Sequence, residues 1–129
     1  MREGLKKVSY RFFILLITII LLLNLNVKTV SAIEKYDVKL IEKISKDYTK
    51  KFCNSIAFGL SKESAMNFSI AENKQVFKNK KGVNKIKKEI LAEEIAISTV
   101  ENCGYLINLK GQKGIEEFKN YYLDKEKVS

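Results

Sequence analysis

The sequence predicts an all-α protein, a small bundle of three to four helices. The 129-residue chain contains no proline and only six glycines, so few residues interrupt a helix. Apolar residues recur at spacings of three and four, which is the period of one helix face. Strand-like alternation of apolar and polar residues is scarce. We therefore expect a single helical domain behind an export signal.

Residues 1–32 have the three parts of a cleavable secretory signal peptide. Basic residues precede an unbroken apolar run from Phe12 to Leu23, and a more polar stretch then ends in Val30-Ser31-Ala32. The apolar run is shorter than the roughly 17–25 residues that a membrane-spanning helix needs. Cleavage after Ala32 would leave residues 33–129 as one exported domain outside the cytosol. An uncleaved membrane anchor is the alternative.

The first helix of this domain is predicted over residues 34–58. Its core-facing stripe contains six residues at helical spacing: Val38, Ile41, Ile44, Tyr48, Phe52 and Ile56. Lysines occupy much of the opposite side, as is typical of a face in water. Gly59 follows, and glycine at this position indicates the left-handed stop that ends many helices.

A second helix is predicted to start at once. Ser61 is a suitable N-cap, because its hydroxyl can accept from the unpaired amides of the first turn. Leu60 and Ala65 have the spacing of a hydrophobic staple, and Glu63 suits the positive end of the helix. The apolar pattern weakens after Asn73, where we expect this helix to fade; continuation of its apolar side through Val76 and Phe77 is the alternative.

Residues 74–88, here called the basic segment, are the most unusual part of the chain. They contain no acidic residue and seven lysines: Lys74, Lys78, Lys80, Lys81, Lys85, Lys87 and Lys88. Five of the 24 basic and one of the 15 acidic residues fall in residues 1–32, so residues 33–129 carry a net charge of about +5. Without the basic segment that charge would be about −2. A solvated loop and a surface for anionic headgroups or an acidic protein both fit this pattern.

A third helix is predicted over residues 84–103, with Gly104 as a second left-handed stop. Its core face is expected to hold Leu91, Ala92, Ile95, Ala96, Thr99 and Cys103. A second apolar group projects from another side of the helix: Ile86, Ile90, Ile97 and Val100. Either the helix is buried on two sides, or this group forms an apolar contact surface edged with carboxylates.

The tail is predicted to turn at Gly111–Gly114 and then to form a short helix. Of the neighbouring Tyr121 and Tyr122 in that helix, we expect one to pack inward and the other to be available for contact. Residues 124–129 are expected to be frayed.

Cys53 and Cys103 are the only cysteines. An even number in an exported chain predicts a disulfide, and closing a loop of about 51 residues stabilises the fold by roughly 4 kcal/mol. A redox pair is the alternative. Catalytic dithiols are usually close in sequence, however, and these cysteines fall near predicted helix C-termini, where the helix dipole disfavours a thiolate.

Missing residue types argue against several functions. Beyond residue 32 there is no histidine and no arginine, so the usual general base near pH 7, imidazole metal ligands and bidentate phosphate recognition are absent. Four glutamates of the third helix lie on one element without a cleft: Glu89, Glu93, Glu94 and Glu101. We expect them to form a solvated edge that faces lysines of another element. The sequence thus predicts a protein that is not an enzyme and has no metal, cofactor or nucleic-acid partner.

Two stretches, KFCNSIAFGLSKESAMNFSIAEN and ENCGYLINLKGQKGIEEFKNYY, resemble small uncharacterised exported proteins of cyanobacteria and related plastids. The Cys-Asn and Asn-Cys-Gly-Tyr contexts carry this resemblance, which covers most of residues 33–129. It implies a thylakoid-lumen or periplasmic location and no particular activity or site.

These observations predict an exported accessory or binding protein that acts by contact on the lumenal or periplasmic side of a membrane or membrane complex. Its contact surface would combine the seven lysines with Ile86, Ile90, Ile97 and Val100. The partner would be a protein or an anionic membrane surface. A redox factor that uses Cys53 and Cys103, and a small-ligand carrier, are the alternatives. The sequence does not determine the oligomeric state.

Overall fold

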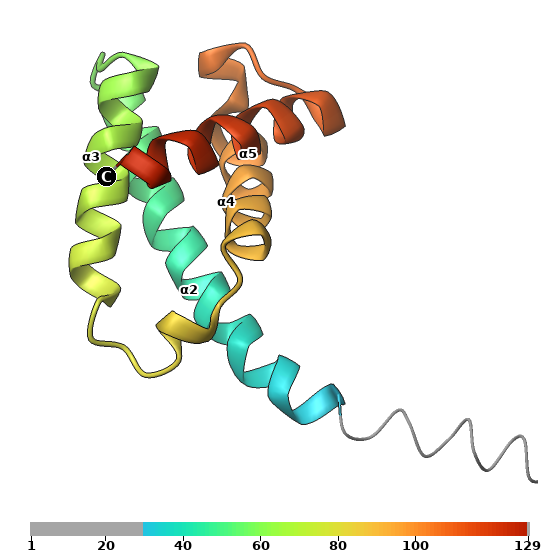
Figure 1. The fold of residues 1–129 in the computed structure, drawn as a ribbon. Helices are drawn as coiled ribbons and strands as arrows, with labels where there is room; N and C mark the ends of the chain where they lie inside the picture. The colour runs from blue at the N-terminus through green and yellow to red at the C-terminus, as the bar shows by residue number, and fades with distance from the viewer. Residues whose placement is uncertain (1–29, 129) are drawn as a thin grey trace, which may run out of the picture. The chain divides into compact units, whose positions relative to one another are not determined.

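The computed structural model describes the backbone of residues 30–128 and the side chains of residues 38–128, and one compact unit begins at Asp37. This part of the chain is all-α and contains no strand (Figure 1). Its elements are α2 (Val30–Ala57), α3 (Lys62–Phe77), the 3-10 helix η1 (Val83–Lys85), α4 (Lys88–Cys103), the 3-10 helix η2 (Gly104–Ile107) and α5 (Gly111–Val128). The predicted helical fold is confirmed. The predicted signal peptide lies outside the described residues except for the backbone of residues 30–32.

Helices α2 and α4 run in the same direction (Figure 1). Two links along them have the same offset in sequence: the hydroxyl groups of Thr49 and Thr99 share a hydrogen bond of 3.2 Å, and Cys53 is bonded to Cys103. Each link joins a residue of α2 to the residue of α4 that comes 50 positions later. Lys88 at the start of α4 therefore lies level with Val38 of α2.

Helix α3 runs in the opposite direction to α2 (Figure 1). Near the end of α3, the side-chain amide of Asn73 donates to the Ile44 carbonyl oxygen over 3.0 Å and to an Asp47 carboxylate oxygen over 2.9 Å. The end of α3 and the start of α4 therefore both lie beside the first turns of α2 in the compact unit. The basic segment, which joins these two helices, is consequently at that end of the bundle.

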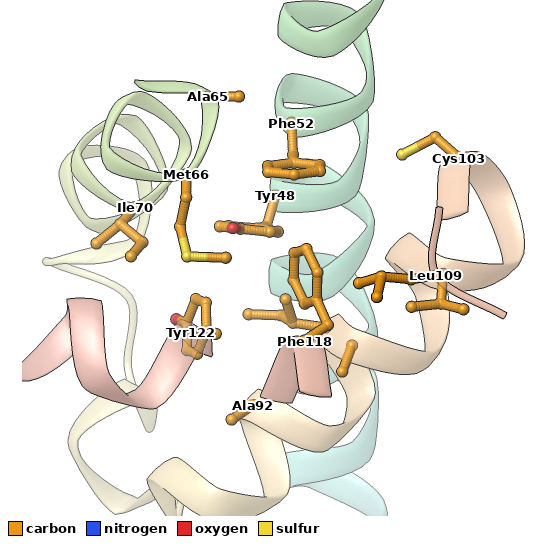
Figure 2. Packing of buried hydrophobic residues seen from close by; sticks show 13 residues of the cluster. Tyr48, Phe52, Ala65, Met66, Ile70, Ala92, Cys103, Leu109, Phe118 and Tyr122 are labelled. Atoms are coloured by element: carbon orange, nitrogen blue, oxygen red, sulfur yellow. The ribbon is translucent and has the colours of Figure 1, made fainter. Parts of the chain in front are cut away.

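The core is built around four aromatic rings from α2 and α5 (Figure 2). Tyr48 and Phe52 stack with their ring centroids 6.0 Å apart. From α5, Phe118 meets Phe52 edge-on at 5.1 Å, and Tyr122 meets Tyr48 edge-on at 5.3 Å. Helices α3 and α4 fill the remaining space with smaller side chains: Ala65, Met66, Ile70, Ala92, Ile95, Ala96 and Val100. Because its rings complete the core, α5 is an integral part of the fold.

The interior also contains polar groups, of which Thr99 was predicted for the core face and Thr49 was not. Thr49 and Thr99 are buried and share a hydrogen bond of 3.2 Å between α2 and α4. The Tyr48 hydroxyl is fully buried and has no hydrogen-bond partner among the described residues. Burial raises the pKa of Tyr48 well above its ordinary value, and the neighbouring Tyr122 and Tyr121 raise it further. Burial also raises the pKa of Tyr122, so the side chains of Tyr48 and Tyr122 are both neutral phenols in the core.

The predicted boundary between the first two helices is confirmed. Gly59 has φ +91°, and its amide donates to the Ile56 carbonyl oxygen over 2.9 Å. The next amide, of Leu60, donates to the Ser55 carbonyl oxygen over 3.0 Å, which completes a Schellman stop. Ser61 then caps α3 by accepting from an amide of its first turn.

Three predicted details of the helices are wrong. Helix α3 does not fade at Asn73 but continues to Phe77, because both of these side chains are buried against the rest of the bundle. Val38 does not face the core; 58 % of it is exposed, since it lies at the end of the bundle. Helix α4 starts at Lys88 and not at Asn84, because a left-handed Gly82 and the 3-10 turn η1 come first.

Gly104 also has a different role from the one predicted. Its φ is −56°, which is right-handed, and the left-handed residue that ends η2 is Asn108 with φ 58°. A Cβ on Gly104 would lie 2.5 Å from the Leu109 carbonyl oxygen and 3.1 Å from a methyl group of Val100. Glycine is needed here because the backbone after α4 folds back against it, not because of its φ.

The tail is more ordered than predicted. Gly111–Gly114 is the first turn of α5 and not a separate turn, and Gly114 is buried against Leu109. Helix α5 continues to Val128, so the residues from Asp124 to Val128 are helical and not frayed. Of the paired tyrosines, Tyr122 is buried and Tyr121 is partly exposed, as expected of neighbours on a helix.

Candidate contact surface

The basic segment forms the connection between the antiparallel α3 and the start of α4. Lys74 lies in the last turn of α3, and the left-handed Gly82 turns the chain into η1. The seven lysines are all exposed and belong to the same end of the molecule. This connection between two helices thus carries seven of the 19 lysines of residues 33–129.

Glu126 of α5 links the two ends of the basic segment. One carboxylate oxygen lies 2.9 Å from the Lys88 ammonium group, and the other lies 3.6 Å from that of Lys74. The Glu126 side chain is only 14 % exposed, although both lysines are largely in water. This ion-pair triad therefore joins α3, α4 and α5 and neutralises part of the charge where the segment begins and ends.

The middle of the basic segment has no such compensation. Lys78 donates to the side-chain oxygen of Gln75 over 2.9 Å, which leaves its charge intact. Among the described residues, no ion pair reaches the five lysines between the ends: Lys78, Lys80, Lys81, Lys85 and Lys87. Five adjacent positive charges consequently face solvent together.

The apolar group predicted to accompany the lysines is not one continuous surface. Ile90 is 51 % exposed, whereas Ile86 and Ile97 are half-buried. Val100 is only 9 % exposed and belongs to the core beside Gly104. The part of this group available for contact is therefore Ile90 in the first turn of α4, with the edges of Ile86 and Ile97.

The glutamates of α4 lie mostly in water, and one of them faces a lysine of another helix. Glu89, Glu93 and Glu101 are exposed. On α5, Glu116 raises the pKa of Lys119 through a hydrogen bond and its charge, and Glu93 adds to this effect from α4. This is the arrangement predicted for the acidic edge, and it places opposite charges along the contact between α4 and α5.

A second set of ion pairs on α5 was not predicted from the sequence. Lys125 pairs with Glu63 in the first turn of α3, and this hydrogen bond lowers the pKa of Glu63. The ammonium groups of Lys62 and Lys125 lie 4.9 Å and 5.7 Å from the centre of the Tyr121 ring. Lys125 pairs with the first turn of α3, and Glu126 pairs with its last turn. The end of α5 therefore lies beside α3, between the two ends of that helix (Figure 1).

The predicted disulfide is confirmed. The sulfur atoms of Cys53 and Cys103 are bonded, and the Cα atoms are 5.7 Å apart. Cys103 is 2 % exposed, and the bond lies at the end of the bundle opposite to the basic segment. It closes a ring of chain that contains all of α3 and the whole basic segment.

Two searches of the described residues gave no further site. No group of three or more histidine, cysteine, aspartate or glutamate side chains is arranged to hold a metal ion within this region. None of the helices described is both long and apolar enough to cross a membrane.

No protein-family model, no curated protein and no solved structure matches this chain. The resemblance to exported proteins of cyanobacteria and plastids therefore stays a prediction from the residues alone. The argument for function depends on the surface described above.

Proposed function

We propose that this chain is an exported, non-enzymatic accessory protein that acts by contact at the lumenal or periplasmic side of a membrane or membrane complex. The observation that supports it most is the distribution of charge. The basic segment contributes seven positive charges, and the rest of residues 33–129 is slightly negative. A charge so concentrated attracts an anionic surface and orients the protein toward it.

The ion pairs strengthen this proposal. Glu126 holds the segment by its two ends, at Lys74 and Lys88, so the lysines between them project from a defined turn. Elsewhere in the described residues, many charges are already paired within the domain, for example Lys51 with Asp47 over 2.6 Å. Unpaired lysines also occur elsewhere in that part of the chain, as at Lys43 and Lys50, but the basic segment groups five of them within ten residues that contain no acidic residue.

The disulfide is compatible with export. A bond between two cysteines far apart in sequence is stable in an oxidising compartment and is rare in the cytosol. Together with the predicted signal peptide, it supports a location outside the cytosol.

The test is retention on native membranes isolated from the compartment in which the exported protein is found. We expect retention that decreases as salt is raised and that is lost in the variant K78Q/K80Q/K81Q/K85Q. The matched control K43Q/K50Q/K110Q/K113Q removes the same charge at exposed lysines elsewhere and should stay bound. Equal, salt-sensitive retention of both variants would refute the proposal.

A further inference from the structure

We propose that the direct partner of the basic segment is the anionic lipid bilayer itself. On this proposal the free lysines lie against the phosphate headgroups, and exposed aliphatic side chains around them enter the interface. The inference rests on the proposed function and specifies its partner.

The chemistry of the segment favours a diffuse array of phosphates over a single bound anion. Lysine is a compact point charge on a flexible stem and lacks the fixed fork with which arginine grips one phosphate. All five free charges are lysines on exposed positions, and no buried polar group is arranged among them to form a pocket. Such a surface matches many mobile headgroups at once, as at an anionic leaflet.

Exposed aliphatic residues surround the lysines. Val38, the first residue of α2 whose side chain is described, is 58 % exposed. Val76 is 49 % exposed in the last turn of α3, and Ile90 is 51 % exposed in the first turn of α4. Val76 lies within the basic segment, Ile90 lies just after it, and Val38 lies level with the start of α4. Aliphatic side chains beside lysines are typical of surfaces that rest in the membrane interface.

A nucleic acid would need a different surface. Bases stack on exposed aromatic rings, and the only aromatic residue of the basic segment or its flanking turns, Phe77, is buried in the bundle. Valine and isoleucine favour acyl chains over bases. The surface composition therefore selects lipid between these two anionic partners.

The direction of the chain adds a geometric argument. Helix α2 leads into the compact unit near Val38, at the same end as the basic segment. In the sequence, only residues 24–36 separate this end from the apolar run Phe12–Leu23. As long as that run is joined to the domain, whether before cleavage or as an anchor, it tethers to the bilayer the end that carries the lysines.

The experiment uses the exported protein with the N-terminus that the cell leaves on it, and protein-free vesicles. One set contains phosphatidylcholine alone and the other contains phosphatidylcholine mixed with phosphatidylglycerol. We expect stronger binding to the anionic vesicles, and K78Q/K80Q/K81Q/K85Q should weaken it roughly a hundredfold. K43Q/K50Q/K110Q/K113Q should change it much less. A retained anchor would bind both vesicle types, so the difference between them reports the lysines.

A second variant separates insertion from charge. V76S/I90S removes two exposed aliphatic side chains without changing charge, and its thermal melt should match that of the parent. We expect several-fold weaker binding to anionic vesicles with an unchanged salt dependence. Unaltered binding would refute the insertion of these side chains.

The outcomes also separate this inference from the proposed function. Lysine-dependent retention on native membranes without binding to anionic vesicles would overturn the lipid partner and indicate an acidic protein in its place. Loss of lysine dependence on native membranes would refute the proposed function itself. Equal binding of the parent protein to both vesicle types would likewise overturn the role of the headgroup charge.

Discussion

The two ends of this bundle are held by different kinds of interaction. At one end, a disulfide joins α2 to α4, and the backbone packs so closely that Gly104 has no room for a side chain. At the other end, the helices are connected by exposed lysines and by one carboxylate, Glu126, which is shared between Lys74 and Lys88. The first set of constraints is covalent or steric and the second is electrostatic. The covalent and steric constraints therefore lie away from the surface proposed for contact, where hydrogen bonds of Asn73 also join α3 to α2.

The two ends of the bundle also expose different apolar side chains. The disulfide end exposes the aromatic residues Phe58 and Tyr105, at 85 % and 72 %, without a cluster of lysines beside them. The basic end exposes valine and isoleucine among free lysines. The disulfide end also exposes Leu60 and Leu106, at 41 % and 44 %, so the basic end is distinguished by the run of lysines beside its valine and isoleucine side chains.

The largest loss of stability should come from removing the disulfide. Changing both Cys53 and Cys103 to serine should lower the free energy of unfolding by about 4 kcal/mol. The bond joins residues 50 positions apart, and without it the unfolded chain gains conformational entropy. Urea denaturation of the parent and the double variant measures this difference. Little loss of stability on reduction, together with a low-pKa thiol, would instead favour the redox alternative for these cysteines.

A smaller loss of stability should follow when a side chain is added to Gly104, at the same end of the bundle. Gly104→Ala places a methyl group against the Leu109 carbonyl oxygen and should cost about 1–3 kcal/mol. Gly59→Ala is the matched control, since nothing lies within 4 Å of its added carbon and only its φ of +91° opposes the change. We expect the control to cost about 1 kcal/mol. Equal losses in thermal unfolding would show that close packing at Gly104 is not the constraint.

The smallest effect on stability should be at the basic end. Glu126→Gln breaks pairs with lysines that are 46 % and 68 % exposed, so screening by water limits the loss to about 1 kcal/mol or less. The same change releases two lysines and should strengthen binding to anionic vesicles. Weaker binding would show that the carboxylate is needed to shape the surface and does more than neutralise charge.

Local chemistry made much of the fold predictable. The helical period located Tyr48 and Phe52 in the core, the glycine and serine between α2 and α3 indicated a stop and a cap, and the even cysteine count indicated the disulfide. Gly104 was misassigned because a glycine after a helix looks the same in sequence whether it supplies a left-handed φ or room for the backbone. The end of α3 was misplaced because Asn73 is polar, and its burial depends on oxygen atoms of α2.

The candidate surface was predictable only in part, for a related reason. The sequence locates the seven lysines, but which of them are free depends on Glu126, which lies 38 residues beyond Lys88 and in a tail expected to fray. Val100 was assigned to the surface because two faces of α4 are apolar, and the sequence does not reveal which one the loop after α4 covers.

The ring closed by Cys53 and Cys103 should determine what happens when a protease cuts the chain between them. The free lysines of the turn, such as Lys80 and Lys81, are exposed targets for a lysine-specific protease. A cut there would divide the chain into α2 with α3 and α4 with α5, but the disulfide would still join the fragments. The nicked protein should therefore run as one band on a non-reducing gel and as two bands after reduction. A chain closed in this way can be cut at its most accessible point and stay one molecule.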